Sequence, residues 1–189
     1  MIPQLNAAME LQTFCKDRGW PFCFIGALAV LRWGEPRATQ DVDATLLTGF
    51  GNEESFIQDL LSGFQSRLPD ALDFALKHRV LLLRAHNGID VDISLGALPF
   101  EQNVVQRATP FSFAPDVILI TCSAEDLVVL KAFASRSKDW IDIEGIMIRQ
   151  GEQLDWKYIL KTLTPLCELK TAPEILQRLH ELQVRLTES

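Results

Sequence analysis

The sequence contains a short apolar segment that carries two aspartates two positions apart, Asp41 and Asp43. The segment continues to Leu47 and predicts a buried strand. Successive side chains of a strand alternate between its faces, so Asp41 and Asp43 should point the same way while Val42 points into the core. Two carboxylates on one face of an apolar strand repel each other unless a cation lies between them, and a hard divalent ion such as Mg²⁺ suits them best.

The string Asp-x-Asp is common, and a strand end at the surface would leave both acids solvated. The residues ahead of it favour a site instead. Ile25-Gly26-Ala27 predicts a strand, a tight turn and a helix start, and glycine allows the backbone to approach a phosphate closely. Arg37 and Thr39 add a cation and a hydroxyl just before the acids. Together these residues outline a site for a nucleoside triphosphate and a metal ion.

A second Asp-x-Asp pair lies in a predicted β-hairpin. Residues 79–86 and 89–95 have the character of strands, and Asn87-Gly88 between them is a strong hairpin signal. Alternation places Asp90 and Asp92 on the face opposite the apolar side chains. The hairpin would supply a third carboxylate to the first pair. The alternative is that one of the two acids is solvated at a sheet edge.

The order Gly26-Ala27, a short apolar helix and Arg37-x-Thr39-x-Asp41-Val42-Asp43 resembles the signature of the nucleotidyltransferase superfamily typified by DNA polymerase beta. The resemblance is to its minimal bacterial branch, which includes AbiEii-like abortive-infection toxins and antibiotic nucleotidyltransferases, and it covers roughly residues 20–145. Related proteins usually have Gly or Ser where this chain has Ala27. Alanine is still small, but it offers no hydroxyl to a phosphate.

The resemblance implies an α+β nucleotidyltransferase fold, with a small mixed β-sheet flanked by helices and a C-terminal helical segment. We expect a catalytic core over residues 1–121 and a helical part packed on that core over residues 122–189. The sequence itself supports a change near residue 122, because Ser123 and the acid three residues on form a capping box that opens a strong helix.

The resemblance also implies roles for individual residues. Asp41 and Asp43 would be catalytic and would bind Mg²⁺ or Mn²⁺. In the family the third acid lies on an adjoining strand and helps to deprotonate the attacking hydroxyl, which places Asp92 first and Asp90 second. The residues implied to bind the nucleotide are Gly26, Ala27, Arg37, Thr39 and Lys131.

Lys131 is the single charge in the apolar run 127–134 of the predicted helix after Ser123. Lysine is seldom fully buried without a partner, so its amine must reach solvent, acids or phosphates. Asp139 and Asp142 follow three positions apart, on one helical face. The resemblance implies that Lys131 touches the triphosphate. The charged residues that follow could equally have a surface or structural role or lie near the site. These residues are Arg136, Lys138, Asp139 and Asp142.

The composition of the chain excludes some classes of protein. A net charge of −7 and a pI near 5.0 argue against a protein that binds nucleic acid over its whole surface. Four scattered cysteines lack metal-ligand spacing and are expected to be buried thiols in a reducing cytosol. The N-terminus lacks the character of a signal peptide, and no segment reaches the about 18 apolar residues of a membrane span. We expect a soluble, cytoplasmic protein without a membrane partner.

Hydrophobic periodicity and turn signals predict the remaining elements. These are helices over 4–18, 27–33, 53–67, 70–76, 124–135, 156–163 and 173–187, a short helix within 96–108, and strands over 20–25 and 117–121, with Pro165 between the last two helices.

The implied activity is transfer of a nucleoside monophosphate from a nucleoside triphosphate such as ATP to a hydroxyl acceptor. The acceptor would be RNA such as tRNA, a protein or a small molecule. One such enzyme is a toxin of a toxin-antitoxin system, which would have an antitoxin or another protein as partner. The alternative is a catalytically degenerate binding module that acts through a protein partner. A purely structural protein would need Asp41, Asp43 and Asp92 to be solvent-facing and far apart.

Overall fold

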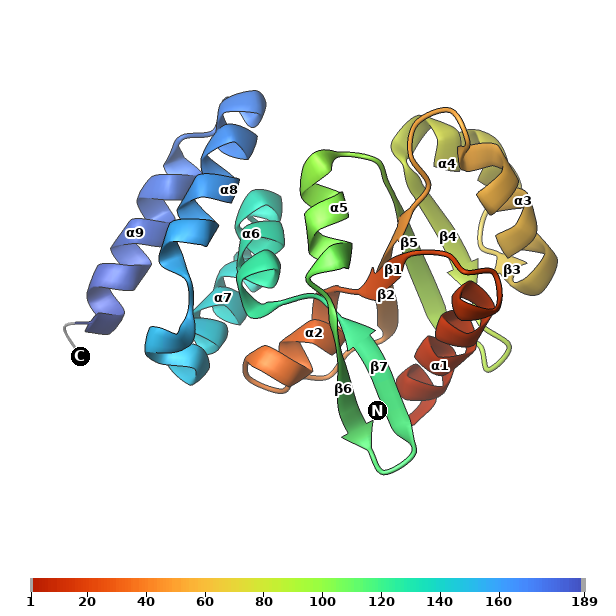
Figure 1. The fold of residues 1–189 in the computed structure, drawn as a ribbon, viewed down its shortest axis with the longest axis horizontal. Helices are drawn as coiled ribbons and strands as arrows, with labels where there is room; N and C mark the ends of the chain where they lie inside the picture. The colour runs from red at the N-terminus through yellow and green to blue at the C-terminus, as the bar shows by residue number, and fades with distance from the viewer. Residues whose placement is uncertain (1, 188–189) are drawn as a thin grey trace. The chain divides into compact units, whose positions relative to one another are not determined.

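The structure is a computed structural model that describes residues 2–187, and the chain forms two compact units. The first comprises Met1–Leu28 and Arg37–Cys122, and the second comprises Ala29–Pro36 and Ser123–Ser189. The first holds the sheet, and the second is helical (Figure 1). Helix α2 (Gly26–Trp33) contributes its first residues to the first unit and its remaining residues to the second.

The first unit is built on a seven-stranded mixed sheet in the order β3-β4-β5-β2-β1-β7-β6. Helix α1 packs against β7 and β2, and α5 packs against β2 and β1 (Figure 1). The strands are β1 (Phe22–Phe24), β2 (Asp41–Leu47), β3 (Gln65–Ser66), β4 (Val80–Arg84), β5 (Asp90–Gly96), β6 (Thr109–Ala114) and β7 (Val117–Thr121). The helices are α1 (Ile2–Asp17), α3 (Glu53–Gly63), α4 (Ala71–His78) and α5 (Pro99–Gln106).

Strands β2 and β5 lie side by side in the middle of the sheet, paired in parallel. Their apolar side chains alternate with polar ones and are at most 1% exposed: Val42, Ala44 and Leu46 on β2, and Val91, Ile93 and Leu95 on β5. This alternation is the pattern that the sequence predicted. Strands β4 and β5 form the antiparallel hairpin expected around Asn87 and Gly88. The core of the unit therefore fixes which way the aspartates of β2 and β5 face.

The second unit is a helical assembly in which α6 (Ala124–Ala134) packs against α7 (Ser137–Gln150), α8 (Trp156–Lys170) and α9 (Glu174–Thr187). A short 3-10 helix, η1 (Gly151–Gln153), follows α7. The Ser123 hydroxyl accepts a hydrogen bond from the Asp126 amide at 3.1 Å, which confirms the predicted cap of α6. Arg149 donates to the Gly34 carbonyl at 2.7 Å and fastens the segment after α2 to α7.

Two element predictions were wrong around helix ends. The helix predicted over 53–67 ends at Gly63, and residues 65–66 form the edge strand β3. Gly63 lies against the ring of Phe14, where a side chain would clash, and the backbone becomes extended at Phe64. Helix α8 was predicted to stop at 163 but continues through Pro165 to Lys170. Burial of Leu163 and Cys167 on either side of the proline outweighs the lost backbone hydrogen bond.

Strand β6 was not predicted at all. Its residues are mostly exposed and include Pro110, so they lack the alternation that marks a strand. It forms an antiparallel hairpin with β7, with an irregularity between Ser112 and Ala114.

All four cysteines are free and buried, as predicted. None of the helices within residues 2–187 combines the length and apolar character needed to span a membrane.

Candidate active site

Four aspartates form a cluster on one face of β2 and β5. The parallel register pairs Asp41 with Asp90 and Asp43 with Asp92. All four are half-buried, whereas Val42 and Val91 between them are fully buried. Because register partners on neighbouring strands lie about 4.8 Å apart and share a face, we call Asp41, Asp43, Asp90 and Asp92 the carboxylate face. The structure thus brings both Asp-x-Asp pairs together.

Gly26 lies directly against Asp43. It begins α2 with a φ of +58°, and a Cβ atom built on it would overlap the Asp43 carboxyl group. The Ile25 amide donates to the Asp43 carbonyl at 3.0 Å and holds the two segments together. Glycine is needed here for both the left-handed backbone and the close approach. Ala27, by contrast, is 5% exposed, so its methyl group is buried in the core.

Thr39 contacts the first acid of the pair. Its hydroxyl lies 2.9 Å from Asp41 Oδ1, to which it donates. The Thr39 carbonyl in turn accepts a hydrogen bond from Gln4 of α1 at 2.9 Å. Arg37 lies in the loop before β2, where its guanidinium contacts the Ala38 carbonyl at 3.5 Å. The bend before β2 therefore orients the Asp41 carboxylate.

Arg67 is the residue of the site that the sequence analysis missed. It follows β3, and its guanidinium pairs with Asp92 and lies 3.4 Å from Asp90. Asp90 also pairs with Arg84 at 2.9 Å. The wrong helix prediction over 53–67 hid Arg67, because it made this residue the end of a helix instead of a residue that follows an edge strand and pairs with β4. The alternation of the hairpin offered no signal for it either, since Arg67 lies 25 positions from Asp92.

Burial raises the pKa of the Asp92 carboxyl group, even though the positive charge of Arg67 lowers it. The negative charges of Asp41 and Asp90 add to the increase. A carboxylate with a raised pKa holds a proton more strongly, so it is a better general base than an ordinary aspartate. Asp92 has this property on the carboxylate face.

The donor chemistry of the carboxylate face fits a hard divalent ion. Carboxylate oxygens are the ligands that Mg²⁺ and Mn²⁺ prefer, and Asp41 and Asp43 present theirs from one strand. Asp92 is the register partner of Asp43 but is directed to Arg67. Within residues 2–187 no three His, Cys, Asp or Glu side chains are grouped closely enough to hold an ion as they stand.

Lys131, Asp139 and Asp142 form a buried cluster within the helical unit. The Lys131 ammonium is 2.6 Å from Asp142 and 3.3 Å from Asp139, and its side chain is 6% exposed. Arg136 adds a second cation, 2.7 Å from Asp139. Burial would raise the pKa of Asp139, but Arg136 and Lys131 outweigh burial and lower it. Lys138 is exposed at the surface.

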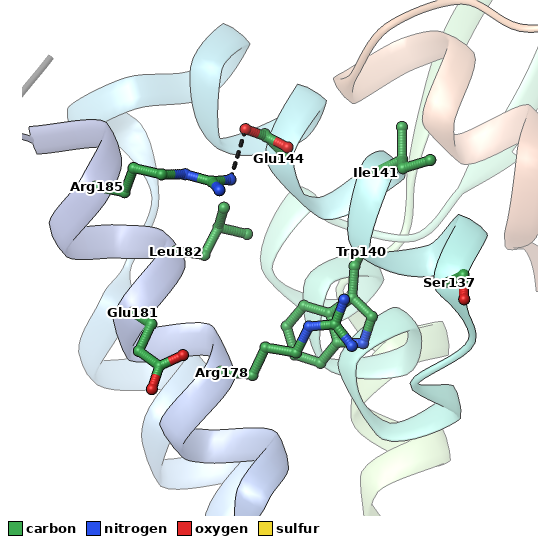
Figure 2. A pocket seen from close by; sticks show the side chains of 8 residues that line it. All are labelled: Ser137, Trp140, Ile141, Glu144, Arg178, Glu181, Leu182 and Arg185. Carbon is green, nitrogen blue, oxygen red and sulfur yellow. Dashed lines mark hydrogen bonds and ion pairs between the residues drawn. The ribbon is translucent and has the colours of Figure 1, made fainter.

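A pocket of about 410 Å³ lies between α7 and α9. Figure 2 shows the side chains that line it. The Arg178 guanidinium covers the ring of Trp140 at 4.5 Å, and Arg185 pairs with Glu144 at 2.8 Å. Glu181 and Ile141 also line the pocket. Its two arginines and two glutamates balance in charge, and none of the residues predicted for the site lines it.

Residues 4–185 match the sequence model of a family described as "Nucleotidyltransferase of unknown function (DUF6036)". No curated protein sequence matches the chain.

Several solved structures share the fold. An antigenic nucleotidyltransferase-like protein from Paracoccidioides brasiliensis aligns with a TM-score of 0.51 at 16% identity, over 89% of each chain. The lincomycin-bound lincosamide antibiotic adenylyltransferase LnuA aligns with a TM-score of 0.52 at 14% identity, over 75% of this chain and 94% of its own. The antibiotic-resistance factor ANT(2'')-Ia aligns with 0.52 at 14%, over 94% and 97%. These likenesses confirm the predicted fold class.

Proposed function

The chain belongs to the nucleotidyltransferase family whose model spans residues 4–185, and from this membership we propose that it transfers a nucleoside monophosphate from a nucleoside triphosphate to a hydroxyl group, with Mg²⁺ or Mn²⁺ as cofactor. The family membership confirms the superfamily that the sequence predicted. The observation that carries the proposed reaction is the carboxylate face, with the Gly26 turn placed against Asp43. No structural role of a sheet requires four acids there.

Asp41, Asp43 and Asp92 are the catalytic and metal-binding residues of this proposal. A bound divalent ion would neutralise charge on the triphosphate and on the leaving pyrophosphate. Asp92 takes the proton of the acceptor hydroxyl, and its raised pKa supports this role. The acceptor oxygen then bonds to the α-phosphorus as the bond to the pyrophosphate oxygen breaks. Asp90 is the weaker candidate for the third acid, because two arginines already compensate its charge.

We place the triphosphate at the start of α2. Gly26 and Ala27 open that helix, and backbone amides at a helix N-terminus favour phosphate. Arg37 adds positive charge from the loop before β2. Thr39 acts through Asp41, because its hydroxyl already donates to that carboxylate. The site therefore combines phosphate donors from one segment with carboxylates from two strands.

The family resemblance implies one role for Lys131, and its contacts in the structure support another. The family resemblance assigns its amine to the triphosphate, and this contact stays a prediction. The two buried ion pairs with Asp139 and Asp142 support a bracing role within the helical unit instead. Asp139, Asp142 and Arg136 share that role.

The first experiment is thermal unfolding of the protein with each of the four nucleoside triphosphates, with and without Mg²⁺. A ligand that binds the native state raises the midpoint by linkage. We expect a Mg²⁺-dependent rise with at least one triphosphate, which Asp43→Asn removes and Asp73→Asn keeps, because Asp73 is exposed on α4. No rise with any triphosphate in the wild type would contradict the proposed donor site.

The acceptor is the least defined part of the proposal. Two of the structural neighbours are named for antibiotics, so ATP and a small hydroxylated molecule are the first donor and acceptor to test. Because family resemblance also includes toxins that act on RNA or protein, expression in a host without an antitoxin is the matching test. A toxin stops growth and the Asp43→Asn variant does not, whereas an antibiotic-modifying enzyme leaves growth unchanged.

The second candidate function is a binding module that retains the fold without catalysis. The ion pair between Arg67 and Asp92 favours it, because the guanidinium occupies a carboxylate oxygen that a metal ion or an acceptor hydroxyl would need. Tight nucleotide binding that ignores Mg²⁺, together with no release of pyrophosphate, would support the module. Pyrophosphate release that depends on Asp43 would exclude it.

A further inference from the structure

Arg67 provides a positive charge to two acids of the carboxylate face at once. Its Nη1 pairs with Asp92 Oδ1, and its Nε lies 3.4 Å from Asp90 Oδ2. The backbone amide of Arg67 donates to the Leu82 carbonyl at 3.1 Å, so the residue is fixed beside β4. Its side chain is 25% exposed, and that of Asp92 is 32% exposed. The guanidinium is therefore a partly desolvated counter-ion that belongs to the sheet.

The two acids of β5 differ in how they are paired. Asp90 has two arginines, since Arg84 Nε lies 2.9 Å from its Oδ1 while Arg67 approaches its Oδ2. Asp92 pairs with Arg67 and is the register partner of Asp43. If the contact between Arg67 and Asp92 broke, Arg67 could still bind the carboxylate of Asp90. The pairing thus allows Arg67 to leave one acid and remain on the other.

We propose that Arg67 is a positioning residue that competes with the divalent ion for the carboxylate of Asp92, and that the ion displaces it onto Asp90. This inference rests on the proposed function, because it takes Asp92 as a ligand shared with Asp41 and Asp43. In the ion-free protein, Arg67 compensates charge on the carboxylate face and holds Asp92 in place.

The competition has a simple electrostatic cause. A carboxylate has two oxygens, so an ion could in principle bind one while Arg67 keeps the other. The guanidinium would then place a full positive charge within a few ångströms of a doubly charged ion, in a site that is only partly solvated. Such repulsion favours release of one cation. The ion carries the larger charge and gains Asp41 and Asp43 as further ligands, whereas Arg67 gains only a shorter contact with Asp90.

The test is calorimetric titration of the whole, nucleotide-free protein with MnCl₂, which measures binding independently of activity. We expect Arg67→Gln to tighten the apparent Kd for Mn²⁺ by about fivefold to tenfold, because the competing cation is removed. Arg84→Gln is the matched control, since Arg84 contacts Asp90, and its Kd should stay within about twofold of the wild type. In an Asp92→Asn background, Arg67→Gln should give no tightening.

Arg67→Lys provides a second variant if the glutamine variant does not fold. Lysine keeps the charge but cannot reproduce both contacts of the planar guanidinium, so the Kd should tighten by about twofold. Unchanged or weaker Mn²⁺ binding in the folded variants would overturn the competition. Equal tightening in Arg84→Gln would also overturn it, because the effect would then be one of net charge alone.

Asp43→Asn separates this inference from the proposed function. One outcome is that the wild type binds Mn²⁺, that Asp43→Asn abolishes this binding and that Arg67→Gln leaves the Kd unchanged. The proposed metal site is then supported, and only the competition by Arg67 is overturned. If the wild type shows no Mn²⁺ binding that depends on Asp43, the metal-dependent function fails and the competition fails with it.

Discussion

Gly26 and Asp43 are in such close contact that no side chain fits between them, because a Cβ atom at Gly26 would overlap the Asp43 carboxyl group. Gly26 also has a φ of +58°, which L-residues rarely adopt. The two constraints act on different properties. The backbone conformation affects stability, and the contact determines where Asp43 points.

Replacement of Gly26 by alanine should therefore reduce both stability and nucleotide binding. We expect a loss of at least about 2 kcal/mol in the free energy of unfolding, from the left-handed backbone and the overlap together. Gly51→Ala is the control, since Gly51 has a φ of +85° but open space around it. It should cost about 1 kcal/mol and leave the triphosphate-induced shift in midpoint intact. Equal loss of that shift in both variants would contradict a specific role for the contact.

Removal of the Thr39 hydroxyl should affect the site more than the fold. In Thr39→Val the Asp41 carboxylate loses its donor, which should cost about 1 kcal/mol of stability and weaken Mn²⁺ binding. Thr39→Ser keeps the hydroxyl and should retain wild-type Mn²⁺ affinity. Denaturant unfolding and calorimetric titration measure the two effects. Equal Mn²⁺ affinity in all three proteins would show that Thr39 does not orient Asp41.

Replacement of Lys131 by methionine should strongly destabilise the protein. It leaves Asp139 and Asp142, which are 0% and 4% exposed, as buried acids without their shared cation. Breaking such a buried pair costs about 3–5 kcal/mol, measured by denaturant unfolding at neutral pH. Lys138→Met changes an exposed lysine at the start of α7 and should stay within about 0.5 kcal/mol of the wild type. A mild effect of Lys131→Met would argue against the bracing role.

The cluster of Lys131, Asp139 and Asp142 also predicts how the stability of the protein depends on pH. The pKa of Asp139 is lowered in the folded protein, so the ionised form stabilises folding. This contribution is fully present above the unfolded pKa of about 3.9 and is lost as the pH falls through the lower, folded pKa. Asp139→Asn should thus be less stable at neutral pH and lose less stability below about pH 4. Parallel pH profiles of the two proteins would contradict this assignment.

The buried thiols should be unreactive in the native protein. Burial raises the pKa of Cys15 to about 12, and burial also raises the pKa of Cys167. Because the thiolate is the nucleophile, a disulfide reagent at pH 8 should label the native protein slowly and all four cysteines quickly in denaturant. Rapid labelling of a native thiol would identify local opening around that cysteine.

Alternation was enough to predict the carboxylate face in part. It correctly placed the acids of each strand on the face opposite Val42 and Val91, because a buried apolar side has period two. It did not distinguish Asp90 from Asp92, since both face the same way and the distinction depends on register and on arginine partners. Arg67 could not be predicted, because its position depends on the end of α3 at Gly63 and on pairing with β4. Pro165 misled the prediction of α8, where packing outweighs local propensity.

The parallel pairing of β2 with β5 also has a consequence for how the protein folds. In the sequence, α3, β3, α4 and β4 separate the two strands, so pairing Asp43 with Asp92 requires closing the long stretch of chain that these four elements make up. Contacts between residues so distant in sequence form slowly, because the intervening chain must first lose conformational entropy. The repulsion among the acids adds a further barrier that Arg67 reduces. During synthesis and refolding, the carboxylate face should therefore be among the last parts of the sheet to form, and Mn²⁺ binding should return after most of the secondary structure.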